Sequence, residues 1–179
     1  MAPGRGNSPL HPARTVHLVR MTDAERDEAL RQEAEEYGAA KARAGFWPRE
    51  GCTDRAREEI AGLLGSDPAS RGHAFFVGVD GAGRRVGWVW YGPVPGSGTA
   101  AGKRWLFQIA VDEPLRGNGY GRGLLEAVER RLAEEGMHEL SLNVFRWNTT
   151  AVGLYERSGY EVVSQAAGNL EMRKRLSRA

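Results

Sequence analysis

The segment L-R-G-N-G-Y-G-R-G-L-L, from Leu115 to Leu125, places four glycines and two arginines directly before an aliphatic run. A strand candidate, Trp105–Val111, precedes it, and aliphatic residues then recur at the spacing of one helix face: Leu124, Leu125, Val128 and Leu132. Peptide N–H groups at a helix N-terminus lack partners within the helix, and the helix dipole adds positive potential there. Glycines let such a loop curl tightly around oxygen atoms. The segment therefore predicts a phosphate-binding turn.

Three kinds of glycine loop compete with a glycine-rich turn that binds nothing. A P-loop requires Lys followed by Ser or Thr, and neither dipeptide occurs in the chain. In the dinucleotide-binding fingerprint G-x-G-x-x-G, Arg122 would stand in place of the third glycine. This fingerprint normally follows an early strand in a βαβ unit, and the segment here does not. The third form, Arg/Gln-x-x-Gly-x-Gly/Ala, is matched by Arg116, Gly119 and Gly121. The loop alone leaves this form and the non-binding turn about even.

A second motif lies downstream and decides between them. The pattern N-x-x-A-x-x-L-Y-E-x-x-G-[FY] is matched by Asn148, Ala151, Leu154, Tyr155, Glu156, Gly159 and Tyr160. Together with the glycine segment, this pattern resembles the GNAT superfamily of acetyl-CoA-dependent N-acetyltransferases. The two motifs cover about Trp105 to Tyr160, and two motifs at the right separation are far more specific than either one.

The remaining sequence has the strand and helix signals of a single α/β domain. The expected elements are a strand at 15–20, helices at 23–44 and 54–64, strands at 73–80, 85–92 and 105–111, a helix from 119 to about 135, a strand at 139–145, a helix at 148–158, and strands at 160–166 and 170–174. The order is βααβββαβαββ, which extends the resemblance over most of the chain and implies a mixed, mostly antiparallel sheet with helices on both faces. Residues 1–14 are expected to form a disordered N-terminal tail, and residues 15–179 the GNAT-like N-acetyltransferase domain.

The resemblance implies where coenzyme A would bind. In the superfamily two parallel strands splay apart and the pantetheine arm lies between them; here these strands would be Trp105–Val111 and Glu139–Phe145. A bulge in the first would free backbone groups of Ile109, Ala110 and Val111 for the pantetheine and for the thioester oxyanion. The backbone of the glycine loop would hold the pyrophosphate, flanked by arginines: Arg116, Gly117, Asn118, Gly119, Tyr120, Gly121 and Arg122.

Two residues of the second motif are candidates for specific roles. Asn148 is equally suited to cap the N-terminus of its helix and to contact the cofactor. Tyr155 is the expected catalytic residue, because a departing thiolate is a fair base and a neutral phenol can donate a proton to it. Its alternative role is to fill the core with the hydroxyl pointing outward.

Gln108 departs from the superfamily pattern. Many relatives carry Asp or Glu at this position as general base, and an amide cannot take the proton of an ammonium acceptor. The proton could leave through ordered water, through Glu33 or Glu36 of the first helix, or through the substrate itself. Both glutamates are expected on a solvated helix face, so the sequence leaves the base unidentified. His73 and His138 each begin a predicted strand and are expected to be structural.

The composition sets limits on the partners. The 25 Lys and Arg residues against 23 Asp and Glu give a net charge of +2, which is too small to imply a nucleic-acid partner. No apolar run approaches the roughly 18 residues of a membrane span, and the N-terminus lacks the apolar core of a signal peptide. A single cysteine, Cys52, excludes an intrachain disulfide. We expect a cytoplasmic protein with neither nucleic acid nor membrane as partner.

The expected function is direct transfer of an acetyl group from acetyl-CoA, as co-substrate and without a metal, to a primary amine of a small molecule, peptide or protein. One alternative is a non-catalytic acyl-CoA-binding sensor or partner module, which Gln108 makes conceivable. Another is an acyltransferase that uses a different acyl-CoA. A homodimer is common in the superfamily, although nothing in the sequence demands one.

Overall fold

The computed structural model describes residues 13–69, 71–96 and 101–177, so that most of the predicted tail lies outside the described residues. Its elements are β1 (His17–Arg20), α1 (Asp23–Arg43), α2 (Cys52–Leu64), β2 (Ala74–Val79), β3 (Arg85–Gly92), β4 (Lys103–Val111), the 3₁₀ turn η1 (Glu113–Leu115), α3 (Tyr120–Glu134), β5 (Glu139–Phe145), α4 (Thr149–Arg157), β6 (Glu161–Ala166) and β7 (Asn169–Arg175). The predicted order βααβββαβαββ is confirmed, and a 3₁₀ turn, η1, is added between β4 and α3.

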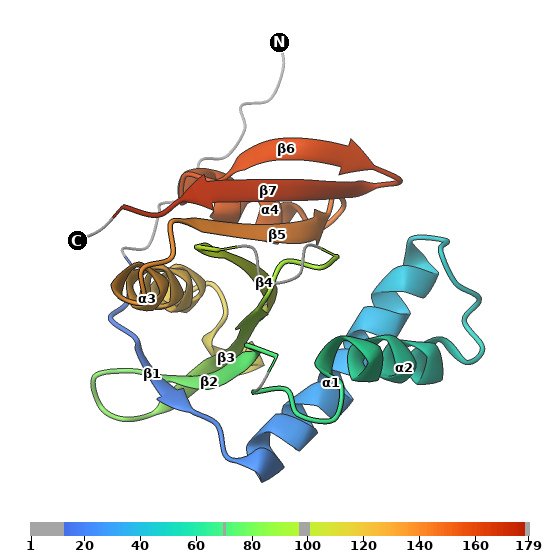
Figure 1. The fold of residues 1–179 in the computed structure, drawn as a ribbon, viewed down its shortest axis with the longest axis horizontal. Coiled ribbons are helices and arrows are strands. Elements are labelled where there is room, and N and C mark those ends of the chain that lie inside the picture. Colours follow the sequence, from blue (N-terminus) through green and yellow to red (C-terminus); the bar gives the residue numbers. More distant parts are fainter. Residues whose placement is uncertain (1–12, 70, 97–100, 178–179) are drawn as a thin grey trace.

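The strands form one seven-stranded sheet in the order β1-β2-β3-β4-β5-β7-β6 (Figure 1). Every neighbouring pair is antiparallel except β4 and β5, which are parallel. Figure 1 shows α1 and α2 on one side of this sheet and α3 on the other. The expected fold class, a mixed and mostly antiparallel sheet with helices on both faces, is therefore confirmed.

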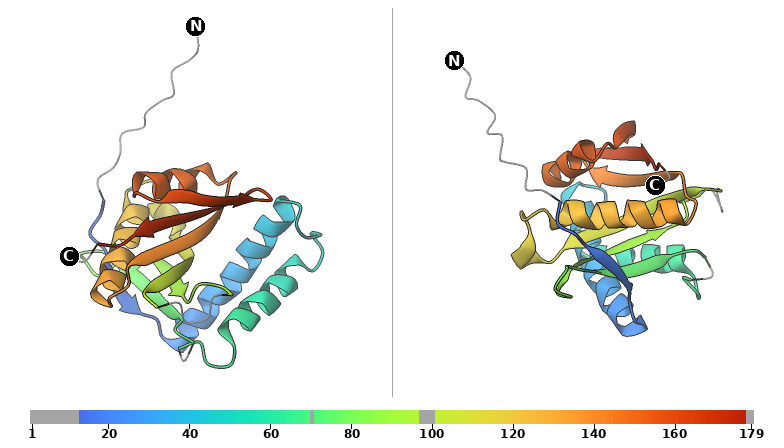
Figure 2. Two further views of the ribbon diagram at one scale, coloured as in Figure 1. Left: turned by 45° about the horizontal axis from the view of Figure 1, so that its top comes forward. Right: turned by 90° about the vertical axis from the view of Figure 1, so that its left-hand side faces the viewer.

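Each face of the sheet has its own apolar core. On the α3 face, the four aliphatic residues that define the helix stripe are all fully buried: Leu124, Leu125, Val128 and Leu132. On the opposite face, α1 and α2 cover an aromatic layer that includes Phe75, Trp88 and Trp90. The two helices lie side by side (Figure 2), and they approach so closely that a Cβ on Gly38 would lie 2.7 Å from the carbonyl oxygen of Cys52.

The helix starts follow local capping chemistry, with one correction. Thr22 and Glu25 form the predicted capping box at the start of α1. The second helix begins at Cys52 rather than at Asp54, because Gly51 takes a left-handed conformation (φ 72°) and serves as N-cap. Asp54 lies instead in the first turn, where its charge favours the helix dipole and pairs with Arg57 at 2.9 Å.

The sheet parts between its two parallel strands. β4 and β5 pair over only four residues each, Lys103–Leu106 opposite Glu139–Leu142. Beyond these residues β4 stays paired to β3 as far as Val111, and β5 stays paired to β7 as far as Phe145. The predicted splay is therefore present, and one edge of each strand lacks a strand partner there.

Candidate active site

Three segments that lie far apart in the sequence converge beside this parting of the strands. A Cβ on Gly121, in the first turn of α3, would lie 3.6 Å from Cγ2 of Val111 at the end of β4. The same Cβ would lie 3.5 Å from Cδ2 of Leu154 in α4. The glycine loop, the end of β4 and the helix of the second motif thus meet at one place.

The glycine loop directs its peptide donors away from its own chain. Within the described residues, no acceptor is found for the backbone N–H groups from Gly117 to Arg122, and the first bond of α3 runs from Gly123 N–H to the carbonyl of Gly119 (3.1 Å). The loop carbonyls are used locally instead, since Nδ2 of Asn118 donates to the carbonyls of residues 115 and 116. Gly117 and Gly119 have φ of 77° and 86°, a conformation that favours glycine. The result is a row of unpaired donors suited to an anion.

The arginines beside this row are held by the protein but retain donors. Nε of Arg116 donates to the carbonyl of Val111 (3.1 Å), and Nε of Arg122 donates to Glu126 (2.8 Å). A guanidinium has five N–H donors, so each can still reach a ligand.

The side chain of Tyr120 fixes the start of α3 and is not available to a cofactor. Its ring is buried, and its hydroxyl accepts from Arg84 (2.9 Å) and lies 3.3 Å from Oδ2 of Asp80 in the β2–β3 turn. The guanidinium of Arg14 lies 5.7 Å from the centre of this ring, and its Nε donates to the carbonyl of Asn118 (3.4 Å). The backbone N–H of Tyr120, and not its side chain, therefore stays a predicted contact to the cofactor.

The backbone of β4 faces the parting of the strands at alternate residues. Asp112 N–H donates to the carbonyl of Val86 in β3 (3.0 Å), and pairing alternates along an antiparallel ladder, so the N–H and C=O groups of Val111 and Ile109 point away from β3. Consistent with this, the carbonyl of Val111 is the group that accepts from Arg116. The expected bulge lies at Phe107, where the register with β3 shifts, just before these residues.

The side chains on the two faces of β4 contact different parts of the protein. The side chains of Ile109 and Val111 pack into the core that contains Tyr155. The side chains of Gln108 and Ala110 lie on the opposite face, where Gln108 contacts α1 and Ala110 packs in the aromatic core. Groups from α4 and from α1 therefore flank β4 from opposite sides.

Tyr155 and Asn148 hold the positions expected of the second motif. Tyr155 is buried (7% exposed), and burial raises the pKa of its phenol, which keeps it protonated. No partner for its hydroxyl is found in the part of the chain that the structure describes. Oδ1 of Asn148 accepts from the N–H of Ala151 (3.2 Å), so the capping role is confirmed. The roles of both residues toward a cofactor stay predictions.

The expectation of a solvated face is right for Glu36 and wrong for Glu33. Glu33 is only 9% exposed, because the face of α1 that carries it packs on the aromatic core of the sheet and its carboxylate contacts Gln108 of β4. Nε2 of Gln108 donates to Oε2 of Glu33, and Oε1 of Gln108 accepts from the N–H of Ile109 (2.8 Å). Burial raises the pKa of Glu33 to about 7; the hydrogen bond from Gln108 lowers it and the charge of Glu36 raises it.

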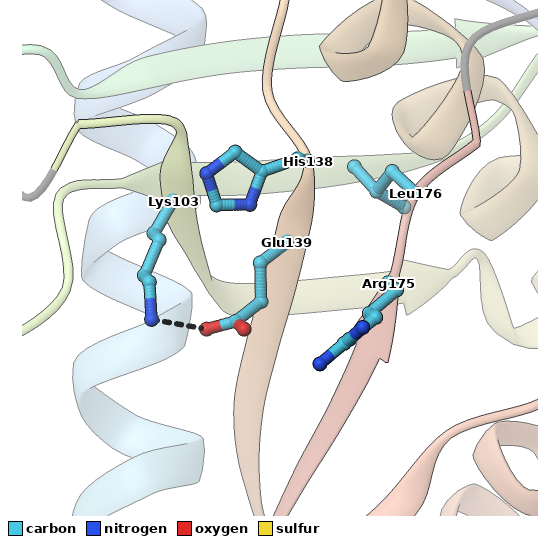
Figure 3. Close-up of a pocket in the computed structure, with 5 residues that line it drawn as sticks. All are labelled: Lys103, His138, Glu139, Arg175 and Leu176. Carbon is cyan, nitrogen blue, oxygen red and sulfur yellow. Dashed lines mark ion pairs between the residues drawn. The ribbon is translucent and has the colours of Figure 1, made fainter.

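Two surface cavities differ in their relation to the site. One, of about 490 Å³, lies between α1 and the ends of β3 and β4, next to Gln32 and Asp112. The other, of about 440 Å³, is lined by Lys103, His138, Glu139, Arg175 and Leu176 (Figure 3). It lies at the ends of β4 and β5 that remain paired, where Lys103 and Glu139 form an ion pair (3.2 Å). The second cavity is therefore remote from the candidate chemistry.

The remaining candidate groups support the fold, and the ring of His73 contacts that of Phe107 (centroids 5.3 Å apart) next to the parting of the strands. His73 is buried, and its Nδ1 accepts from Nε1 of Trp90 (3.1 Å). Across the described ranges, no three His, Cys, Asp or Glu side chains gather as a metal site would require. None of the helices described combines the length and apolar character needed to cross a bilayer.

Comparison with known proteins identifies the family. Residues 26–160 match the acetyltransferase (GNAT) family. The chain belongs to this family. An uncharacterised N-acetyltransferase of Bacillus subtilis, YdgE, is 26% identical over 159 residues, which cover 89% of this chain and 97% of that protein.

Solved structures of GNAT proteins share the fold. The crystal structure of YycN, an uncharacterised N-acetyltransferase of B. subtilis, is 26% identical with a TM-score of 0.78, covering 85% of this chain and 96% of its own. A PaiA N-acetyltransferase from Thermoplasma acidophilum in complex with coenzyme A has a TM-score of 0.65 at 15% identity, covering 90% and 99% of the two chains. A spermidine N-acetyltransferase from Vibrio cholerae, in complex with CoA and spermine, has a TM-score of 0.62 at 17% identity, with 92% and 97% covered. The last two show the fold alone.

Proposed function

We propose that this GNAT acetyltransferase uses acetyl-CoA as co-substrate and transfers the acetyl group directly to a primary amine of a small molecule, peptide or protein. The observation that carries the proposal is the row of unpaired N–H donors from Gly117 to Arg122 beside the parting of β4 and β5. These donors suit a diphosphate, and the unpaired strand edges suit an extended pantetheine arm. The CoA complexes named for two structural neighbours support the same donor.

The backbone and Asn148 would hold and activate the thioester. With the pyrophosphate on the glycine loop, the arm would lie along β4. Within the segment from Ile109 to Val111, the carbonyl of Ile109 and the N–H of Val111 would face it, because the N–H of Ile109 donates to Gln108 and Ala110 pairs with β3. An N–H of this segment would stabilise the oxyanion that forms when the amine attacks. Asn148, at the start of α4, would contact the arm from the side of β5.

Tyr155 would complete the transfer as general acid. The amine nitrogen forms a bond to the carbonyl carbon, the carbon–sulfur bond breaks, and the leaving thiolate takes the phenolic proton. The raised pKa of Tyr155 keeps its phenol protonated until the thiolate forms. The nitrogen loses a proton in the same reaction, and Tyr155 recovers its own from solvent. Acyl-enzyme formation would need an activated nucleophile, and among the described residues no base is hydrogen-bonded to the thiol of Cys52 at the start of α2.

Titration with coenzyme A followed by an amine panel tests the proposal. We expect CoA to bind with measurable heat, and acetyl-CoA to be consumed with at least one amine among polyamines, amino acids and peptides. Tight CoA binding without transfer to any amine would support the non-catalytic sensor instead. Faster turnover with succinyl-CoA or a longer acyl-CoA would favour the alternative donor. The cytoplasmic location and the homodimer stay predictions.

A further inference from the structure

A buried carboxylate lies on the face of β4 opposite Tyr155. Glu33 follows Ala29 by one helical turn and precedes Tyr37 by one, so all three lie on the stripe of α1 that packs toward the sheet. Its exposed fraction is 9%, and its contact on the sheet is Gln108, at the point where β4 leaves β5. The carboxylate is thus held beside the place where the thioester would lie.

The two hydrogen bonds of Gln108 fix how this carboxylate is presented. Because Oε1 of Gln108 accepts from the N–H of Ile109, its Nε2 must be the atom that faces Glu33, and it donates to Oε2. Oε2 is therefore an acceptor. Among the described residues, Oε1 of Glu33 has no hydrogen-bond partner, and it is not one of the side-chain oxygens sealed from solvent. One oxygen is anchored and the other is open.

Stability alone does not explain a carboxylate at this position. Burying a carboxyl group disfavours its charge, and no cation contributes to the pKa of Glu33. The charged group that contributes to its pKa is itself acidic: Glu36 on α1. The neighbouring Tyr37 donates its hydroxyl proton to Oε2 of Glu59 on α2 (3.2 Å), and burial together with the charges of Glu59 and Glu33 raises the pKa of this phenol. An amide of the same shape would avoid the desolvation cost. Ionisable groups that are retained at such a cost cluster at functional sites.

We propose that Glu33 is the base that takes the proton from the acceptor amine, and that Gln108 is a positioning residue that holds it. The inference rests on the proposed N-acetyltransferase activity. The proton passes from the amine nitrogen to the open oxygen of Glu33, and the freed lone pair attacks the thioester carbonyl. Solvent then takes the proton from Glu33. A carboxylate supplied by α1 thus reaches β4 where many relatives carry the acid on the strand itself.

The pH dependence of turnover provides the first test. With its pKa raised to about 7, Glu33 is fully charged only above neutrality, so kcat/KM of the wild type should rise with pH through about 7. Glu33→Gln should lower kcat/KM by roughly 10²- to 10⁴-fold and remove that inflection, while the Kd for CoA changes less than about twofold. The matched control is Glu35→Gln, which removes an exposed charge from the same helix and should leave both quantities unchanged.

An exchange of the two side chains provides the second test. E33Q/Q108E keeps the composition and the net charge but moves the carboxylate onto β4. We expect kcat/KM of this double variant to be at least about tenfold higher than that of E33Q. A merely structural effect of the Glu33 substitution would not produce this gain. If E33Q kept the turnover of the wild type, or if its kcat/KM still showed the inflection near pH 7, the role of Glu33 would be overturned and the proposed N-acetyltransferase activity would stand. Absence of transfer by the wild-type protein to every amine would instead overturn the proposed function together with the base.

Discussion

At the scale of single residues, burial has opposite consequences for the two ionisable groups proposed to act. Burial keeps the phenol of Tyr155 protonated at every ordinary pH, as a proton donor requires. The same effect raises the pKa of Glu33 only as far as about 7, so this carboxyl can exchange its proton near neutrality. Because the two groups lie on opposite faces of the sheet, one can serve the sulfur while the other serves the nitrogen.

Replacing Tyr155 by Phe tests the acid half of this arrangement. The ring and its core packing are retained, so the fold and the Kd for CoA should be nearly unchanged. Without the phenolic proton the thiolate must leave unprotonated, and kcat should fall by roughly 10²-fold or more. Steady-state kinetics with calorimetry of CoA binding provide the measurement. A Y155F variant with unchanged kcat would remove Tyr155 from the mechanism.

Glu33 should also make stability depend on pH. Its pKa rises from about 4.5 in the unfolded chain to about 7 in the fold, so between these values the folded state binds more protons. The free energy of unfolding therefore falls as pH rises through this window, by about 3 kcal/mol in total once the pH is above 7. E33Q has no such loss, and its stability relative to the wild type should improve by about 2 to 3 kcal/mol between pH 5 and pH 8. Urea unfolding of both proteins at the two pH values measures the difference, and parallel pH dependence would contradict it.

At the scale of elements, backbone shape decides whether the glycine loop can bind. Gly119 is the N-cap of α3 with φ 86°, and a Cβ there strains the turn that aims the N–H row. Gly119→Ala should lower the free energy of unfolding by about 1 kcal/mol and weaken CoA binding about tenfold or more. Gly136→Ala is the matched control, since Gly136 has φ 79° just past the other end of the same helix, with no atom near a Cβ. It should cost similar stability and leave the Kd for CoA unchanged, so an equal loss of CoA binding in both variants would count against the loop.

The same scale separates what local sequence determines from what it does not. The capping box of Thr22 and the N-cap of Asn148 are predicted correctly because each bond joins residues three apart. The start of α2 is not, because the left-handed Gly51 caps the helix without a side-chain signal. Glu33 is missed for a different reason: its partner Gln108 is 75 residues away, and only the packing of α1 on β4 turns an apparently solvated glutamate into a buried one. A contact between residues so far apart in the sequence produces no local sequence pattern from which it could be predicted.

At the scale of the whole molecule, the sheet consists of two halves joined by a short parallel pair. The strands β1 to β4 form one half and β5, β7 and β6 the other, and within the described residues these halves are joined by the four-residue pairing of β4 with β5. The core under α3 joins them as well, because it contains side chains from both halves. A cofactor arm laid between β4 and β5 would add a second connection at the end where the strands part.

Coenzyme A should therefore stabilise the protein globally and protect it from hydrogen exchange in two separate segments. At a concentration 100 times its Kd, CoA contributes about 2.7 kcal/mol, which raises the Tm of a chain of this size by about 5 to 10 °C. Amide exchange should slow most at Val111, at the end of β4, and at residues 117–122, whose N–H groups face the expected ligand, and change little in β1 and β6 at the sheet edges. Melting curves and exchange measured by mass spectrometry with and without CoA make the comparison. Protection confined to the glycine loop would mean that the diphosphate binds while the arm stays outside the sheet, and protection at neither segment would contradict the proposed site.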